Sequence, residues 1–305
     1  MSGPLSLSPE VAAALAEGTP VVALESTIIA HGLPRPRNLE VAVEFEDILR
    51  SRNVTPATIA VLDGVAHIGL SADELTRVAE DDEMRKFGYR DLAAAVATGS
   101  SGATTVSATA QLASAAGIGV FATGGLGGVH RGWTTDQDES ADLNVLSRTR
   151  ITVVCAGVKS ILDVPATLQR LETLNVTVAG YRTDEFPGFY LTRSGQPVDW
   201  NLESAERIAR VMRAQASLDG PRTALVVANP VSPDLQLDPQ LHDRVLAAGL
   251  AEAEERGITG QEVTPFLLSY LVDHTEGASL EANLAAVRGN VALAADIASA
   301  YAATS

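Results

Sequence analysis

Short apolar runs rich in valine, isoleucine and alanine recur along the chain and predict the strands of a buried sheet. Each run is continuous rather than alternating, and each ends in glycine, asparagine or another polar residue. Continuous runs of this kind are typical of strands that are covered on both faces. The runs span 20–24, 58–64, 118–125, 151–157, 176–181 and 223–230.

Amphipathic stretches with helical periodicity separate these runs and predict helices between the strands. They span 71–80, 104–117, 140–148, 160–174 and 202–215, and the last third of the chain adds 238–256, 262–275 and 279–303. Strands that alternate with helices indicate an α/β protein with a largely parallel sheet and helices on both faces. We expect the helical C-terminal segment to pack back on this sheet. No linker-like or repeated segment is visible, so we predict one domain over residues 1–305.

The acidic composition narrows the classes of partner. The chain has 305 residues, of which 46% are hydrophobic, and its formal net charge is −16. This hydrophobic content suffices for a buried core, whereas a nucleic-acid-binding surface needs clusters of lysine and arginine that this chain lacks. We therefore predict no nucleic-acid partner.

Cysteine usage and hydropathy bear on the location of the protein. Cys155 is the only cysteine, so neither an intrachain disulfide nor a cysteine-based zinc site can form. A reducing compartment is therefore favoured. The chain shows no leader-like start and no apolar stretch of about eighteen residues, the length typical of a membrane span. We expect a cytoplasmic protein with no membrane partner.

Two lysines stand out among the basic residues. Of 22 basic side chains, only Lys86 and Lys159 are lysines, and the rest are arginines, which cannot release a proton to become nucleophiles. Lys159 follows the apolar run 151–157, and we expect it at the carboxyl end of a strand, just before a helix that starts near Ser160. A helix N-terminus disfavours a cation, and burial or a second cation such as Lys86 makes a lysine amine neutral and nucleophilic. The alternative is that both are ordinary lysines.

Two glycine-rich segments offer donors for an anionic group. Residues 98–109, "TGSSGATTVSAT", lead into a predicted helix N-terminus, and residues 122–132, "ATGGLGGVHRG", carry His130 and Arg131. Neither segment is a P-loop, because no Gly-Lys-Ser/Thr sequence follows. Arg131 and Lys86 are the better phosphate candidates because they carry charge. The glycines have an alternative role in tight turns.

Longer stretches resemble the pseudouridine-5'-phosphate glycosidase family, also called pseudouridylate synthases or indigoidine-synthase-A-like proteins. The likeness extends from about residue 8 to about residue 303. It includes "LEST", "KFGYRD", "DESADL" and "AGVKSILD", and it is carried by 23–42, 56–70, 86–109, 121–132, 138–143 and 154–190. The resemblance implies a three-layer α/β/α fold, a homotrimer and a bound Mn²⁺ ion, with Mg²⁺ as the alternative. It also implies reversible cleavage of the C–C glycosidic bond of pseudouridine 5'-phosphate to uracil and ribose 5-phosphate.

The resemblance also assigns residues. It implies that Lys159 is the covalent nucleophile at ribose C1' and that Glu25 is the proton donor. Asp138 is the implied metal ligand. The implied substrate contacts are Lys86, Val106, Ser140, Ala141 and Asp142, with metal-bound water as the alternative partner of Ser140 and Asp142, and we add His130 and Arg131 as candidates. An asparagine of the C-terminal helix is implied to bind substrate, and we favour Asn283 over Asn290.

The acidic motif departs from the family at one position and has a structural alternative. Glu139 stands where many relatives have an apolar residue, and its carboxylate either strengthens metal binding or points to solvent. One or two carboxylates with water are the ligands expected of manganese or magnesium. Without the resemblance, Ser140 or Asp138 is better interpreted as the N-cap of the helix that follows.

The chemistry of a C-nucleoside explains why a lysine is needed. Direct departure from C1' would leave a poorly stabilised carbanion on uracil C5, whereas an amine bound to C1' as an imine permits cleavage of the bond. We expect Glu25 to transfer the protons, with its pKa raised by its place after the apolar strand. The rival functions are a Schiff-base aldolase acting on another sugar phosphate and a non-catalytic protein that binds sugar phosphates.

Overall fold

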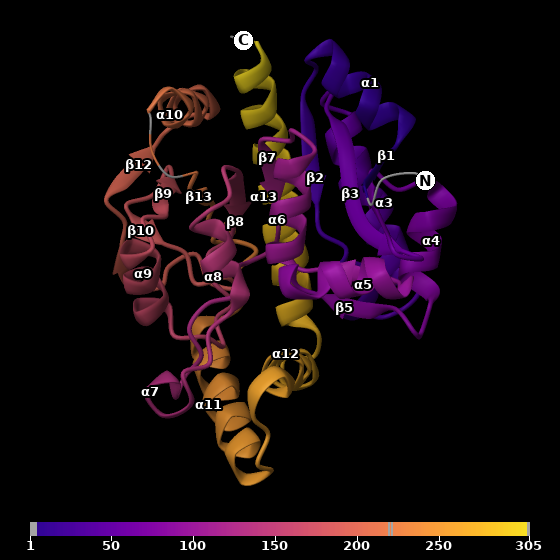
Figure 1. Cartoon of the computed structure of the whole chain (residues 1–305). Helices are drawn as coiled ribbons and strands as arrows, with labels where there is room; N and C mark the ends of the chain where they lie inside the picture. Colours follow the sequence, from indigo (N-terminus) through magenta and orange to yellow (C-terminus); the bar gives the residue numbers. More distant parts are fainter. Residues whose placement is uncertain (1–4, 219, 221, 304–305) are drawn as a thin grey trace.

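The strands of the protein form one large mixed sheet and a small hairpin in a computed structural model (Figure 1), which describes residues 5–218, 220 and 222–303. The sheet contains β1 (Leu5–Leu7), β2 (Val21–Leu24), β3 (Thr55–Leu62), β4 (Val65–Ile68), β5 (Arg85–Phe87), β6 (Gly102–Thr104), β7 (Val120–Ala122), β8 (Thr152–Cys155), β9 (Thr177–Tyr181), β12 (Trp200–Leu202) and β13 (Leu225–Ala228). The hairpin pairs β10 (Glu185–Phe186) with β11 (Gln196–Pro197).

The centre of the sheet is parallel, and one end is mixed. The strand order is β1-β4-β3-β2-β7-β8-β13-β9-β12, and β6 pairs with β3 and β5. Every neighbouring pair from β3 through β2, β7, β8, β13 and β9 to β12 is parallel. In contrast, β3 is antiparallel to both β4 and β6. The predicted runs 20–24, 58–64, 118–125, 151–157, 176–181 and 223–230 all contain strands of this sheet.

Helices cover both faces of the sheet. They are α1 (Pro9–Glu17), α2 (Thr27–His31), α3 (Arg37–Arg50), α4 (Ala72–Glu80), α5 (Leu92–Thr98), α6 (Val106–Ala115), α7 (Trp133–Asp136), α8 (Ala141–Leu146), α9 (Val164–Thr173), α10 (Ala205–Ser217), α11 (Pro239–Glu255), α12 (Val263–His274) and α13 (Ala278–Ala302). In one core cluster, α1, α6, α8 and α9 pack on the sheet, and in a second cluster α3, α10 and α13 pack on it. Successive residues of each central strand enter alternate clusters, as in Val153 and Val154. The predicted α/β/α layering is therefore confirmed.

The long helix α13 binds the two halves of the sheet together. It contacts β2, β7 and β8 through buried aliphatic residues, and Figure 1 shows it running past these strands along most of the molecule. The helices α11 and α12 lie together at the opposite end of α13 from the C-terminus. The predicted packing of the helical C-terminal segment on the sheet is thus confirmed for α13, whereas α11 and α12 pack against each other and α12 against α13. Among the described residues, no helix is both long enough and apolar enough to span a membrane.

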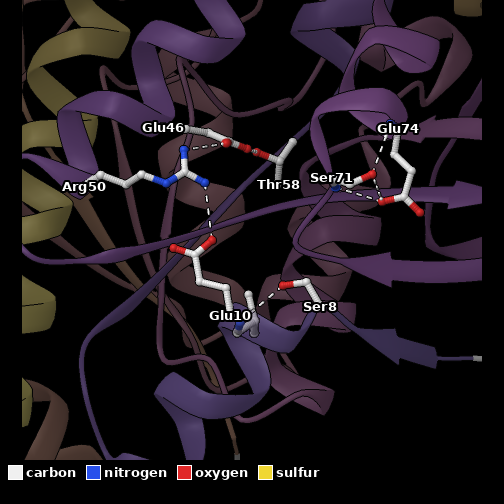
Figure 2. Close-up of polar contacts among 8 residues, drawn as sticks. Ser8, Glu10, Glu46, Arg50, Thr58, Ser71 and Glu74 are labelled. Carbon is white, nitrogen blue, oxygen red and sulfur yellow. Dashed lines mark hydrogen bonds and ion pairs between the residues drawn. The ribbon is translucent and has the colours of Figure 1, made fainter.

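Side-chain hydrogen bonds fix α3 to the sheet and cap the first turns of α1 and α4 (Figure 2). Glu46 of α3 is only 6% exposed, and its carboxylate accepts hydrogen bonds from Thr58 Oγ1 at 2.6 Å and from Arg50 Nη1 at 3.0 Å. Ser8 caps α1, and Ser71 with Glu74 forms a capping box at the start of α4. The two bonds to Glu46 satisfy a buried carboxylate, and the caps satisfy backbone N–H groups at the helix starts.

Candidate active site

The candidate site lies where the strand order of the sheet changes direction. From β2 the chain continues to β3 and β4 on one side, whereas β7, β8 and β13 lie on the other side. In open α/β sheets, ligands bind beyond the carboxyl ends of the strands at such a switch point. Glu25 directly follows β2, Thr123 directly follows β7, and Lys159 follows β8 after three residues. The parallel pairing of these strands therefore gathers residues that are far apart in sequence.

The carboxyl group of Glu25 is held by a threonine of the neighbouring strand. Thr123 Oγ1 donates a hydrogen bond to Glu25 Oε1. Burial raises the pKa of Glu25 above its ordinary value, and this effect exceeds the opposing effects of the Lys159 charge and of the Thr123 hydrogen bond. A carboxyl group with a raised pKa keeps its proton at higher pH and is suited to proton donation.

Lys159 lies in a loop rather than at a helix N-terminus. The helix α9 begins at Val164, with Asp163 as its N-cap, so the prediction of a helix start near Ser160 is wrong. The positive end of the α9 dipole acts only within the first turn of the helix, and the carboxylate of Asp163 caps this end. The backbone N–H of Lys159 donates to Leu126 O at 3.1 Å, and its carbonyl accepts from Leu162 N at 2.9 Å. These bonds fix the loop on the glycine-rich segment 122–132.

Lys86 reaches the site from the mixed end of the sheet. It lies on β5, which is joined through β6 to β3. Although part of the residue is exposed, loss of solvent around the ammonium group and then the charge of Lys159 lower the pKa of Lys86. Glu25 and Asp142 also act electrostatically on Lys86. The structure therefore brings Lys86 and Lys159 together with two of the predicted site carboxylates, Glu25 and Asp142.

Asp142 joins two glycine-rich segments through their backbone. Its carboxylate accepts hydrogen bonds from Ser107 N at 2.8 Å and from Gly127 N at 2.9 Å, and the residue is 6% exposed. Ser107 lies in the first turn of α6, which begins at the buried Val106, so a protein carboxylate lies at the helix N-terminus predicted to bind phosphate. Sequence reasoning missed this clamp, because nothing in the spacing relates position 142 to position 107.

The acidic motif contains one helix cap and one ion pair. Ser140 Oγ accepts from Asp142 N at 3.2 Å and caps α8, as its structural interpretation predicts, while Ala141 is exposed. Glu139 accepts two hydrogen bonds from Arg170, at 2.9 Å and 3.0 Å. Its carboxylate is therefore engaged in an ion pair rather than pointing freely to solvent. Sequence reasoning missed this partner.

Asp138 is the remaining carboxylate of the motif. Its Oδ2 lies 3.7 Å from Nδ1 of His130, and its side chain is 34% exposed. Within the described part of the chain, no group of three or more histidine, cysteine, aspartate or glutamate side chains is arranged to hold a metal ion. The donor set thus fits only an ion that takes most of its ligands from water or from substrate, as Mg²⁺ and similar hard cations do.

Arg131 directs its guanidinium towards the loop that carries Lys159. Its Nε donates to Ile161 O at 3.1 Å, and Nη2 donates to Ser160 O at 3.4 Å. The residue is exposed, and both bonds are made to carbonyl groups. The Arg131 guanidinium, which was predicted to bind phosphate, therefore also holds the loop that carries Lys159.

The two candidate asparagines of α13 have different surroundings. Asn290 is fully buried and donates to Thr123 O at 2.8 Å, while its Oδ1 accepts from Asn229 Nδ2 at 3.0 Å. In contrast, Oδ1 of Asn283 is buried and has no hydrogen-bond partner, and it lies beside Gly124. A buried acceptor without a hydrogen-bond partner is costly. Asn283 is therefore the asparagine whose oxygen can accept a hydrogen bond from a ligand.

The fold and the site define an α/β/α protein in which a lysine and a buried carboxyl group meet at the carboxyl edge of a parallel sheet. The chain belongs to the indigoidine synthase A like protein family, whose model matches residues 10–300. It is similar to the pseudouridine-5'-phosphate glycosidase of Streptomyces griseus subsp. griseus, with 70% identity over 97% of this chain and 92% of the relative. The corresponding protein of Frankia alni is 60% identical over 97% of this chain and 82% of the relative.

Solved structures share the fold over nearly the whole chain. The prealnumycin C-glycosynthase AlnA, in complex with ribulose 5-phosphate, has a TM-score of 0.92 and 34% identity, and the match covers 100% of this chain and 99% of that protein. An indigoidine synthase A (IdgA)-like protein from Thermotoga maritima has a TM-score of 0.87 and 38% identity, covering 96% and 95%. The predicted family and fold are therefore confirmed.

The Asp142 clamp is testable by removing its charge. In Asp142→Asn, the amide oxygen accepts one of the two backbone hydrogen bonds, and the amide NH₂ faces the other N–H. We expect the free energy of unfolding to fall by about 1–3 kcal/mol, because a buried donor loses its partner. Urea unfolding measures this change, with Asp199→Asn at an exposed carboxylate as the control. Equal stabilities of the two variants would contradict the clamp.

Proposed function

We propose that the protein reversibly cleaves the C–C glycosidic bond of pseudouridine 5'-phosphate, giving uracil and ribose 5-phosphate, in the breakdown of pseudouridine. The observation that carries this proposal is the meeting of Lys159 and Glu25 at the switch point of the sheet. Relatives named for this glycosidase activity, with up to 70% identity over nearly the whole chain, support the choice of substrate. The structural neighbour AlnA, solved in complex with ribulose 5-phosphate, supports a sugar-phosphate substrate.

Glu25 begins the reaction as an acid. Burial raises the pKa of Glu25, which favours the protonated form, and in this proposal the carboxyl group donates a proton to the ring oxygen of the ribose as the ring opens. Opening the ring places C1' in conjugation with the carbonyl system of uracil. C1' then becomes an electrophile to which a neutral amine adds.

Lys159 provides that amine. Its nitrogen forms a bond to C1', and protonation of uracil C5 allows the bond between C5 and C1' to break, with the electron pair of the lysine nitrogen forming a C=N bond. Uracil leaves, and the ribose remains on Lys159 as an imine. Addition of water to this imine releases ribose 5-phosphate and regenerates the amine. The reverse sequence forms the glycosidic bond.

The remaining site residues bind the substrate in this proposal. Asn283 offers its unpaired Oδ1 to a uracil N–H, and Lys86 gives a cation for the phosphate. Other contacts are assigned to the loops around these residues, namely Val106, His130, Arg131, Ser140, Ala141 and Asp142. Asn290 is given no substrate contact, because its amide is already bonded to Thr123 and Asn229.

Asp138 is the proposed ligand of a divalent cation, Mn²⁺ or Mg²⁺. It supplies one carboxylate, while Glu139 is engaged by Arg170. A hexacoordinate ion that keeps several waters and contacts a substrate phosphate needs no more than this from the protein. When bound, the ion supplies positive charge near the phosphate. The residues of the chain carry out the proton transfers and the covalent step.

The covalent step is tested with pseudouridine 5'-phosphate and Mn²⁺. We expect release of uracil, followed by its absorbance, and a ribose phosphate adduct on Lys159 after borohydride reduction, located by mass spectrometry. Lys159→Arg keeps the charge but cannot act as a nucleophile, so the rate should fall by about 10³-fold or more. Full activity of Lys159→Arg would refute the nucleophile. Binding without turnover in the wild-type protein would favour the non-catalytic rival, and turnover of other sugar phosphates instead would favour the aldolase.

The metal ligand is tested by direct binding. We expect Asp138→Asn to weaken Mn²⁺ binding by about tenfold or more, measured from the electron paramagnetic resonance signal of free Mn²⁺, because the carboxylate charge is lost. Glu139→Gln is the matched control at the next residue and should keep the wild-type affinity. Equal loss in both variants, or no loss in Asp138→Asn, would contradict the assignment.

Two further properties accompany this function. A homotrimer is proposed, and the apolar exposed residues Tyr89 and Val96 around α5 give one candidate surface for contact between copies. A cytoplasmic location suits the buried free thiol of Cys155, whose pKa burial raises to about 12. Sedimentation equilibrium measures the assembly, and we expect the mass of three chains. The mass of a single chain at micromolar concentration would exclude the trimer.

A further inference from the structure

Thr123 is the one described residue that donates a hydrogen bond to the Glu25 carboxyl group. Its Oγ1 contacts Glu25 Oε1, and the residue is only 2% exposed. The hydroxyl groups next to Glu25 in sequence are used elsewhere, because Ser26 donates to Ile59 O at 2.6 Å and Thr27 donates to Thr104 O at 2.8 Å. Among the residues that the structure describes, none donates to Glu25 Oε2.

The backbone of Thr123 is fixed on both sides. Its N–H donates to Val154 O at 3.0 Å, and its carbonyl accepts from Nδ2 of Asn290 at 2.8 Å. Asn290 in turn accepts from Asn229, which follows β13. The ends of β7, β8 and β13 are thereby joined to α13, and the hydroxyl group is presented to Glu25 from a rigid support.

The direction of this hydrogen bond decides where the acid proton lies. Thr123 Oγ1 has no other acceptor among the described side chains and carbonyls, so its hydrogen is directed at Glu25 Oε1. A carboxyl oxygen that accepts a hydrogen bond acts as the carbonyl oxygen of the protonated acid. With Thr123 Oγ1 as the donor to Oε1, Oε2 is the carboxyl oxygen on which we place the proton.

We propose that Thr123 is the positioning residue of Glu25, holding Oε1 so that the transferable proton is confined to Oε2 and the carboxyl group cannot rotate away from the substrate. This inference rests on the proposed function and deepens it. The charged groups that act on Glu25 are Lys159, Asp142 and Lys86, and a change of the threonine side chain alters none of these residues.

The test compares Thr123→Val with Thr123→Ser in the dependence of kcat/KM on pH. The hydrogen bond stabilises the ionised carboxylate, so its loss raises the pKa of Glu25 further. Because the protonated acid is the active form, activity is lost as pH rises through this pKa. In Thr123→Val we expect this alkaline limb to move up by about one pH unit and the plateau rate to fall about tenfold. In Thr123→Ser we expect the limb to return to the wild-type position.

Thr58→Val is the matched control, because Thr58 also donates to a buried carboxylate, Glu46, in a part of the sheet outside the site (Figure 2). We expect this variant to lose thermal stability and to keep the wild-type pH profile. A wild-type profile in Thr123→Val would overturn the proposal. So would a profile of Thr123→Ser that equals that of Thr123→Val, because packing of the methyl group would then explain the change.

A second measurement needs no substrate and separates the two proposals. Isotope-edited infrared spectroscopy of ¹³C-labelled glutamate, with Glu25→Gln as the reference for assignment, follows the titration of Glu25 in each folded variant. A pKa about one unit higher in Thr123→Val than in the wild type supports the positioning role. Equal pKa values overturn it. Absence of uracil release by the wild type would refute only the proposed function.

Discussion

The parallel hydrogen bonding of β2, β7 and β8 is the constraint on which the site depends. Three adjacent strands end at the same edge of the sheet, so the residues that follow them meet although more than a hundred residues separate Glu25 from Lys159. The strands are buried on both faces, and their register is fixed because a slip of one residue would exchange the side chains of the two core clusters. This edge places the acid directly after β2, and it places the nucleophile in a short loop after β8 that backbone hydrogen bonds hold in position.

Polar groups near this edge are satisfied by hydrogen bonds to the backbone and to other side chains of the site. Asp142 accepts from two amides, Asn290 and Asn229 join strand ends to α13, and Arg131 holds the carbonyls next to Lys159. Such bonds give little net stability, but leaving any of these buried groups unpaired is costly. The network therefore specifies one arrangement of the loops. Within it, Oδ1 of Asn283 is left as a buried acceptor for a ligand.

Much of the fold could be predicted because its central strands are continuous apolar runs. The strands β1, β4, β5, β6 and β12 were not predicted, because they lack the continuous apolar run that marks the equally short β2 and β8. The helix α9 begins at Val164 but was predicted to begin near Ser160. The apolar Ile161 and Leu162 extend the helical pattern, although both pack in the core from a loop. Proline at position 165 and the cap Asp163 mark the true start.

The sequence by itself determined the α/β class, the two unusual lysines and the family, because these depend on composition, periodicity and long collinear motifs. It also placed Glu25 and Lys159 after strands, where chemistry is expected. Only the tertiary structure decided that Thr123 holds Glu25, that Asp142 of α8 accepts a hydrogen bond from the first turn of α6, that Glu139 pairs with Arg170, and which asparagine keeps an unpaired oxygen. These are contacts between distant segments, and they follow from strand order and helix packing, which local sequence patterns do not encode.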